Sequence, residues 1–370
     1  MNHDGAPLIA LAAGGTGGHM FPAQALAQEL KRRNFGVLLV TDKRGARYTE
    51  NFPADEQFLI SAATPSVGGP IAKGVAAVSI AFGLFTSLKE FKKRQPAAAV
   101  GFGGYPSLPA MKAAAIMGIP YGVHEQNGVL GRANRMLAKG AAFAAHAFPV
   151  IEKLPVGVNA IEVGNPVRDA VMEVSETPFS PITDNSDINI LIFGGSQGAS
   201  IFSLTPIKAF ANLPEHIRSR LRVTHQVRET DSDAALAAYA AADIHCEVAP
   251  FFKDLPARMA AAHLVISRAG ASTVTELAAI GRPSILAPLA IAMDDHQTGN
   301  AHVLSKANAA IVLPEKSFNK DALAATLTPL LTNPARLQSM STAAKGTVKS
   351  GAAAALADLV EGVCRLRRAA

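Results

Sequence analysis

Short apolar runs in this chain are followed directly by glycine-rich stretches, and each glycine stretch is followed by a helical pattern. In LIALAAGGTGGHMFPAQALAQEL the apolar run ends at Ala13, and four glycines surround Thr16. The stretches that begin at Gly101 and Gly194 repeat this arrangement. Apolar strands that alternate with helices indicate βαβ units, and hence a parallel sheet with helices on both faces. This feature confines the chain to the α/β class.

The series of strands and helices occurs twice along the chain. The first series ends near residue 148, and the second begins with INILIFGG at Ile188, after a stretch rich in proline and polar turns. A chain of 370 residues is longer than a domain with a single hydrophobic core usually is. We therefore expect two Rossmann-like, doubly wound domains that face a central cleft. The predicted domains are 1–165, joined by a C-terminal helix (348–370) that packs back on it, and 166–347.

The formal charge of +6 lies wholly in the first half of the chain. Residues 1–165 carry 16 basic and 10 acidic side chains, whereas the remaining residues are balanced. A basic half predicts an anionic partner, which is a membrane surface, a nucleic acid or a phosphorylated substrate. A solvated basic surface without a partner is the alternative.

Cysteine content and the N-terminus predict a cytoplasmic protein. Cys246 and Cys364 are far apart and have no metal-binding spacing, which is typical of free thiols. The N-terminus has no basic segment followed by an apolar stretch, so we expect no signal peptide.

Glycine-rich turns after strands suit phosphate binding. Glycine lets backbone N–H groups approach a ligand, and a helix that begins there favours an anion. Close packing of helix on strand is the alternative. The spacing differs from G-x-G-x-x-G, since Met20 follows Gly15 and Gly17 at the sixth position, and no G-x-x-x-x-G-K-[ST] occurs. The sequence therefore lacks the motifs that would indicate dinucleotide binding or Walker-type phosphate chemistry.

The most informative stretch, residues 263–304, predicts a nucleotide-sugar site. A strand is followed by a turn at Gly270 and a helix that contains Glu276. Glu276 either accepts hydrogen bonds from ribose hydroxyls or closes a capping box with Thr273. After the next strand, the polar segment 294–297 (Asp-Asp-His-Gln) suits the hydroxyls of a sugar, with a solvated loop as the alternative.

The chain resembles the GT-B glycosyltransferases, and within them the bacterial transferases that add N-acetylglucosamine (GlcNAc) to lipid I. The matching stretches are GGTGGH (14–19), GFGGYPSLP (101–109), HEQN (124–127), GNPVR (164–168), GGSQGA (194–199) and SRAGASTVTE…DDHQ…NA (267–301). They cover both domains in order. Two departures are GRAN (131–134) after HEQN, and Phe251-Phe252 where the family often has an aliphatic residue against the uracil.

The resemblance implies that UDP-GlcNAc lies mainly on the second domain. Phe252 would lie near the uracil and Glu276 on the ribose, while Arg168 and Ser196 would hold the diphosphate. The implied donor-binding residues are Thr16, Gly17, Gly18, Asn127, Arg168, Ser196, Phe252, Ala271, Ser272, Thr273, Glu276, His296 and Gln297. The implied acceptor-binding residues are Gly14, Gly15, Gly103, Gly104, Tyr105 and His124.

The implied reaction is an inverting transfer of GlcNAc to the C4 hydroxyl of the muramoyl sugar of lipid I, which gives lipid II in peptidoglycan synthesis. His19 is the expected general base. The alternatives for His19 are acceptor binding without proton transfer, and capping of its helix, which is predicted to start near Pro22. The Asp294-Asp295 pair is a weak metal signal, so we expect neither a metal ion nor another cofactor.

Two other functions remain open at this level. A UDP-GlcNAc 2-epimerase has a similar fold and would use the second-domain site, but it needs acidic catalytic residues at C2 of the sugar. A non-enzymatic, lectin-like or regulatory protein is the other. The combination of His19, Asn127, Glu276 and Gln297 argues against it.

One segment of the first domain suits a membrane surface. Between Lys73 and Lys89 lie 15 uncharged residues, fewer than the roughly 18–20 that cross a bilayer. The bases that follow are Lys89, Lys92, Lys93 and Arg94. We expect peripheral contact with the anionic, cytoplasmic face of the bacterial inner membrane. A buried helix with a basic end is the alternative.

Overall fold

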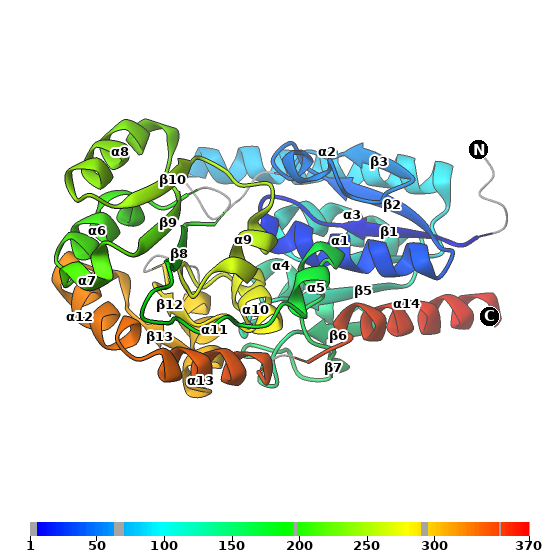
Figure 1. Ribbon diagram of the computed structural model, residues 1–370. Coiled ribbons are helices and arrows are strands. Elements are labelled where there is room, and N and C mark those ends of the chain that lie inside the picture. The colour runs from blue at the N-terminus through cyan, green and yellow to red at the C-terminus, as the bar shows by residue number, and fades with distance from the viewer. Residues whose placement is uncertain (1–5, 63–69, 196–197, 290–294, 348, 370) are drawn as a thin grey trace. The chain divides into compact units, whose positions relative to one another are not determined.

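The chain divides into two compact units, each with its own sheet (Figure 1). A computed structural model describes residues 6–62, 70–195, 198–289, 295–347 and 349–369. Unit 1 comprises Met1–Asp169 and Lys349–Ala370, and unit 2 comprises Ala170–Val348. The first division follows Asp169 rather than residue 165. Asp169 stays with unit 1 because its carboxylate accepts from Arg32 and its backbone N–H donates to Gln28.

Unit 1 is built on a parallel sheet of seven strands in the order β3-β2-β1-β4-β5-β6-β7. The strands are β1 (Leu8–Ala12), β2 (Gly36–Thr41), β3 (Glu56–Leu59), β4 (Ala98–Gly101), β5 (Tyr121–Glu125), β6 (Phe143–His146) and β7 (Ala160–Glu162). The helices are α1 (Gly17–Arg32), α2 (Pro70–Arg94), α3 (Gly104–Ile116), α4 (Arg132–Ala138) and α14 (Ala352–Ala369), with a 3₁₀ turn η1 (Gly45–Tyr48).

Alternate residues of β1 point to opposite faces of this sheet, and both faces are buried. Ile9 and Leu11 pack with α1 and α14, whereas Ala10 and Ala12 pack with α3. The C-terminal helix α14 therefore belongs to unit 1, as the sequence predicts. Arg33, the C-cap of α1, reinforces this packing through ion pairs with two acidic side chains of α14, Asp358 and Glu361.

Unit 2 has a parallel sheet of six strands in the order β10-β9-β8-β11-β12-β13. The strands are β8 (Ile188–Phe193), β9 (Leu221–Gln226), β10 (His245–Ala249), β11 (Leu264–Ser267), β12 (Ser284–Leu286) and β13 (Ala310–Val312). The helices are α5 (Asp169–Ser175), α6 (Ser200–Ala211), α7 (Glu215–Arg218), α8 (Ser232–Ala241), α9 (Leu255–Ala261), α10 (Ala271–Ile280), α11 (His296–Lys306), α12 (Lys320–Leu331) and α13 (Pro334–Lys345). Short 3₁₀ turns are η2 (Glu229–Asp231) and η4 (Glu315–Ser317).

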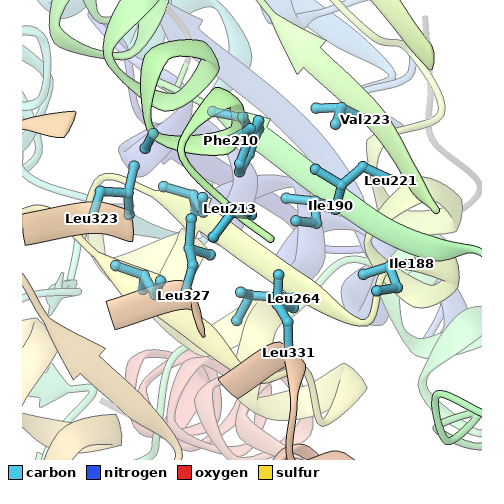
Figure 2. Close-up of a cluster of buried hydrophobic side chains, with 14 of the residues drawn as sticks. Ile188, Ile190, Phe210, Leu213, Leu221, Val223, Leu264, Leu323, Leu327 and Leu331 are labelled. Carbon is cyan, nitrogen blue, oxygen red and sulfur yellow. The ribbon is translucent and has the colours of Figure 1, made fainter. Parts of the chain in front are cut away.

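The larger part of the unit 2 core lies on one face of its sheet. Figure 2 shows strand residues such as Ile190, Val223 and Leu264 close to Phe210 of α6 and Leu327 of α12. These side chains are almost completely removed from water, which makes them the main apolar contribution to the stability of unit 2.

The glycine-rich turns follow the strands at which the strand order of each sheet reverses. In unit 1, β1 pairs with both β2 and β4, and the register sets Ala12 opposite Gly101. In unit 2, β8 pairs with both β9 and β11, and Phe193 lies opposite Ser267. Ligands of open parallel sheets bind beyond the carboxyl ends of the strands at such a switch point. Each unit therefore brings two of the predicted motifs to one sheet edge.

Candidate active site

The turn between β1 and α1 positions His19. Helix α1 begins at Gly17 with Thr16 as its N-cap, and the backbone N–H groups of His19 and Met20 both donate to the Thr16 carbonyl at 3.2 Å. The predicted start near Pro22 is therefore wrong, because Pro22 lies inside the helix. His19 is thus in the first turn of α1, at the positive end of the helix dipole.

The backbone of the same turn orients the His19 ring. Nδ1 lies 3.1 Å from the carbonyl oxygen of Gly14. A carbonyl oxygen only accepts, so Nδ1 is the donor, and the lone pair of the neutral ring is on Nε2. The contact is with a carbonyl and not with a helix N–H group, so it gives the capping alternative no support.

The second glycine stretch makes room for this ring. Gly103 and Gly104 both have positive φ values, +81° and +70°. A Cβ on Gly104 would lie 3.2 Å from Cε1 of His19, and a Cβ on Gly103 would lie 3.2 Å from Nδ2 of Asn134. Part of the purpose of these glycines is therefore to accommodate the imidazole. Tyr105 follows in the first turn of α3 and is half-buried.

A buried carboxylate organises the loop after β5. Glu125 accepts from the backbone and side-chain nitrogens of Asn127, at 3.1 and 3.0 Å. Its other oxygen accepts from the Gly131 backbone N–H and from Nδ2 of Asn134. Sequence reasoning selected Asn127 but missed Glu125, which holds it. A carboxylate that accepts four hydrogen bonds fixes the loop that carries Asn127.

His124 serves the protein interior. Its ring is fully buried, with Nε2 donating to the Gly164 carbonyl at 3.0 Å and Nδ1 3.2 Å from Nε2 of Gln126. Burial lowers the pKa of His124 to about 4, so the ring is neutral at working pH. Both ring nitrogens are engaged inside the protein. The arrangement therefore does not support a direct contact between this ring and the acceptor substrate.

Arg168 lies in unit 1, although the sequence-based boundary assigned it to the second domain. Its guanidinium stacks over the ring of Phe21 in α1, 3.7 Å from the ring centroid. Phe21 in turn meets Tyr48 edge-on. The cation–π contact holds the guanidinium close to the helix that carries His19. Phe21 is a supporting residue that sequence reasoning missed, because it is distant from Arg168 along the chain.

In unit 2, the turn after β8 is fixed from the neighbouring strand. The backbone N–H of Gly194 donates to Oε1 of Gln226 at 3.0 Å. Gly195 and Gly198 have positive φ values, which glycine adopts without strain. Ser196, the predicted diphosphate ligand, lies outside the described residues.

The turn after β11 leads into α10, and it removes one alternative for Glu276. The N-cap is Gly270, so Thr273 is the third residue of the helix and not its cap. The capping-box interpretation of Thr273 and Glu276 is therefore wrong. Glu276 is buried, and it shares a helical face with Ser272 and Thr273, which lie in the partly exposed first turn after Ala271.

The first turn of α11 holds the other predicted sugar ligands. Gln297 accepts at Oε1 from the Leu289 backbone N–H, at 3.0 Å. A sugar contact by Gln297 would therefore use its Nε2 group. His296 is the first residue of α11 and is half-buried. Asp295 is the N-cap and accepts from Thr298, whereas Asp294 lies outside the described residues.

The two phenylalanines after β10 differ in exposure. Phe252 is buried, with the Arg258 guanidinium 4.3 Å from its ring centroid. Phe251 is 57% exposed. The ring that faces solvent is therefore Phe251, and sequence reasoning selected its neighbour.

Two side chains that sequence reasoning did not single out hold the unit 2 edge together. Arg268 donates to the carbonyls of Ala287 and Pro288 after β12, and pairs with Glu315 at 2.9 Å. Asn300 of α11 donates to the Ala269 carbonyl at 3.2 Å. They connect the loop after β11 to the segments before and within α11.

One pair of carboxylates with the Asp-x-Asp spacing was overlooked in the sequence. It is Asp231 and Asp233, and Asp231 already accepts from Ser203 and Arg228. Within the described ranges, no group of three or more His, Cys, Asp or Glu side chains is placed to hold a metal ion.

Comparison with known families identifies the chain. Residues 9–146 match the glycosyltransferase family 28 N-terminal domain, and residues 189–358 match the family 28 C-terminal domain. The chain belongs to glycosyltransferase family 28. A Caulobacter vibrioides (strain NA1000 / CB15N) protein named UDP-N-acetylglucosamine--N-acetylmuramyl-(pentapeptide) pyrophosphoryl-undecaprenol N-acetylglucosamine transferase is 47% identical, over 97% of this chain and 99% of the relative. A protein of the same name from Methylobacterium sp. (strain 4-46) is 46% identical, over 96% of each chain.

Solved structures agree on the fold. The crystal structure of Acinetobacter baumannii MurG superposes with a TM-score of 0.74 at 29% identity, over 96% of this chain and 99% of that one. UDP-GlcNAc 2-epimerase from Neisseria meningitidis, solved with UDP-GlcNAc, has a TM-score of 0.66 at 14% identity, over 96% of this chain and 100% of that one. The epimerase likeness concerns the fold alone.

Proposed function

We propose that this chain transfers GlcNAc from UDP-GlcNAc to the C4 hydroxyl of the muramoyl sugar in MurNAc-(pentapeptide) pyrophosphoryl-undecaprenol, lipid I. The product is lipid II, for peptidoglycan synthesis. The observation that carries this proposal is the 47% identity, over 97% of the chain, to a transferase named for this reaction. The paired glycine turns at the switch point of each sheet are consistent with it, because both substrates carry a diphosphate.

Unit 2 is the proposed donor site. The first turn of α10 would offer backbone N–H groups to the diphosphate, and Glu276 on the same helical face would accept from the ribose hydroxyls. Gln297 and His296 would bind the GlcNAc hydroxyls. We assign the exposed ring of Phe251 to the uracil, in place of the buried ring of Phe252.

Unit 1 is the proposed acceptor site and carries the base. Nε2 of His19 would take the proton of the C4 hydroxyl as its oxygen forms a bond to the anomeric carbon of GlcNAc. The bond between that carbon and the diphosphate oxygen breaks, and UDP leaves with the bonding electron pair. Attack from the opposite face converts the α-linked donor into a β(1→4) product. Arg168 would stabilise the charge that develops on the diphosphate.

A radiolabelled transfer assay distinguishes this function from the epimerase alternative. With UDP-GlcNAc and lipid I together, we expect label to appear in lipid II and UDP to be released. With UDP-GlcNAc alone, we expect no conversion, whereas an epimerase would form UDP-ManNAc. Formation of UDP-ManNAc without lipid I would overturn the proposal in favour of the isomerase.

Helix α2 supports peripheral membrane binding by unit 1. One side of the helix is packed, since Phe91 is fully buried and Ile80, Leu84 and Leu88 contact the same core. The other side exposes an apolar stripe at intervals of three and four residues, between 57% and 69% exposed. The stripe residues are Val75, Val78, Phe82 and Phe85. The alternative of a simply buried helix does not account for this stripe.

The same helix is long and apolar enough to cross a membrane. Among the described residues it is the one such helix, over Gly74–Arg94. Its most apolar 18-residue stretch has a mean hydropathy of 1.3, and 22% of that stretch is buried. It nevertheless connects two strands of one sheet, β3 and β4, and packs against α3. We therefore propose that α2 lies on the membrane surface and does not cross it.

Basic side chains lie beside the stripe. Lys89, Lys92 and Lys93 are exposed at the C-terminal end of α2. Arg94, which sequence analysis grouped with them, pairs with Glu56 and Glu90 and is therefore left out of this surface. Exposed bases beside an apolar stripe suit an anionic leaflet. We place the protein at the cytoplasmic face of the inner membrane.

We expect two single substitutions to separate the apolar and electrostatic parts of this contact. Lys92→Gln should weaken binding to vesicles with anionic lipid about fivefold, because a base near such a surface contributes about 1 kcal/mol. Phe82→Ser should weaken binding to anionic and neutral vesicles alike, because it removes an apolar ring from the interface. Vesicle co-sedimentation at low and moderate salt measures both effects.

Leu236→Ser is the matched control. Leu236 is an exposed apolar residue of α8 in unit 2, 47% exposed, and its loss should leave vesicle binding unchanged. Wild-type binding by the Phe82→Ser variant would mean that another surface contacts the membrane.

A further inference from the structure

Asp42 is a buried acidic residue of unit 1 to which the proposed reaction gives no role. It directly follows β2, which pairs with β1, so it lies at the sheet edge that carries the GGTGGH turn. Its side chain is 7% exposed. A buried carboxylate is costly unless it is hydrogen-bonded, so the groups it binds indicate its purpose.

The carboxylate of Asp42 connects two turns. Oδ1 accepts from the backbone N–H groups of Gly15 at 2.9 Å and Gly45 at 2.8 Å, and Oδ2 accepts from Nε of Arg44 at 3.0 Å. A Cβ on Gly14 would lie 2.7 Å from Oδ1. Gly14 is therefore required for the close approach of this carboxylate to the turn.

The peptide group that Asp42 binds is the one that orients His19. The N–H of Gly15 and the carbonyl of Gly14 belong to a single planar peptide. On one side its N–H donates to Asp42, and on the other its oxygen accepts from Nδ1 of His19 at 3.1 Å. The negative charge of Asp42 polarises this peptide, which makes the Gly14 oxygen a stronger acceptor.

We propose that Asp42 is a positioning residue that acts on His19 through the Gly14–Gly15 peptide. It holds the ring in one orientation and favours the tautomer with the proton on Nδ1, so that Nε2 presents its lone pair. Asp42 itself touches neither substrate nor the reacting atoms. The consequence for catalysis rests on the proposed role of His19 as the base, whereas the effect on the ring does not.

The direct test is the tautomer of His19 in the full-length protein. Nitrogen NMR of histidine labelled with ¹⁵N distinguishes a proton on Nδ1 from one on Nε2, and a His19→Gln sample assigns the resonance. We expect the Nδ1–H form in the wild type. In Asp42→Ala we expect a shift towards Nε2–H, the form that an unconstrained imidazole prefers. An unchanged Nδ1–H form in Asp42→Ala would overturn the proposal.

Kinetics provide the second measurement. Asp42→Ala should lower kcat about tenfold, the scale of loss from a slightly misplaced catalytic group, with the KM for UDP-GlcNAc unchanged. Asp42→Asn should lie between wild type and alanine, because its amide oxygen can still accept from both glycine N–H groups but carries no charge. Asp42→Asn also replaces Asp42→Ala in both measurements if the alanine variant does not fold.

Asp55 provides the matched control. It is another carboxylate of unit 1 that binds a backbone N–H, that of Val37 at 2.7 Å, and it also pairs with Lys31. Asp55→Ala should leave kcat and the His19 tautomer unchanged. An equal loss of kcat in Asp55→Ala would attribute the Asp42 effect to general destabilisation. If Asp42→Ala shifts the His19 tautomer but His19→Ala loses no activity, the role of His19 as base is rejected. The proposed action of Asp42 on the ring then still stands.

Discussion

Replacing His19 with alanine is expected to lower kcat by about 10²–10⁴-fold, the usual contribution of a general base. The affinity for UDP should be unchanged, because the proposed contacts of the uracil and the ribose, Phe251 and Glu276, belong to unit 2, and His19 of unit 1 is not a proposed ligand of UDP. Transfer kinetics at saturating lipid I and calorimetric titration with UDP measure the two quantities. His216→Ala, at an exposed histidine of α7, is the control and should transfer at the wild-type rate.

Two amide substitutions of His19 separate proton transfer from positioning. Asparagine places an N–H donor near the Nδ1 position and keeps the contact with the Gly14 carbonyl. Glutamine places its amide near the Nε2 position, so it can hydrogen-bond a hydroxyl but cannot take its proton. Both should be nearly as slow as alanine. Recovery of most of the rate by His19→Gln would mean that His19 only positions the acceptor and that the base is another group.

The central strands of both sheets could be predicted from the sequence because they are buried on both faces. A strand such as β1 or β8 must then be a continuous apolar run, and the run is visible without an alignment. The outer strands of the unit 1 sheet, β3 and β7, carry no such run. β3 alternates between partly buried and exposed residues, and β7 is partly buried throughout. Outer strands need no apolar run.

The site could be predicted only as far as local patterns reach. Glycines and polar residues at strand ends indicate where a ligand would bind, and the structure places them at the switch points of the sheets. The side chains that hold those residues come from distant parts of the chain. Asp42 is 27 residues from Gly15, and Phe21 is farther still from Arg168. Such pairings are set by the tertiary fold and leave no signal in the spacing of residues.

Replacing Glu276 with alanine is expected to weaken the binding of UDP-GlcNAc and of UDP alike, because the ribose is common to both. The loss of a charged hydrogen-bond acceptor should cost about 1.5–3 kcal/mol, which corresponds to roughly ten- to a hundredfold in affinity. Because Gly270 is the N-cap of α10, this substitution removes no helix cap. Calorimetric titration with UDP and with UDP-GlcNAc is the measurement.

Two further variants of α10 give the Glu276 result its meaning. Glu276→Gln should fall between wild type and alanine, because the amide keeps one acceptor oxygen but loses the charge. Thr275→Val is the control, since Thr275 is the buried neighbour whose hydroxyl donates to the Ala271 carbonyl at 2.9 Å. It should bind UDP as the wild type does. An unchanged UDP affinity in a folded Glu276→Ala protein would exclude the ribose contact. Because a capping box with Thr273 is already excluded, Glu276 would then have to act in the packing of α10.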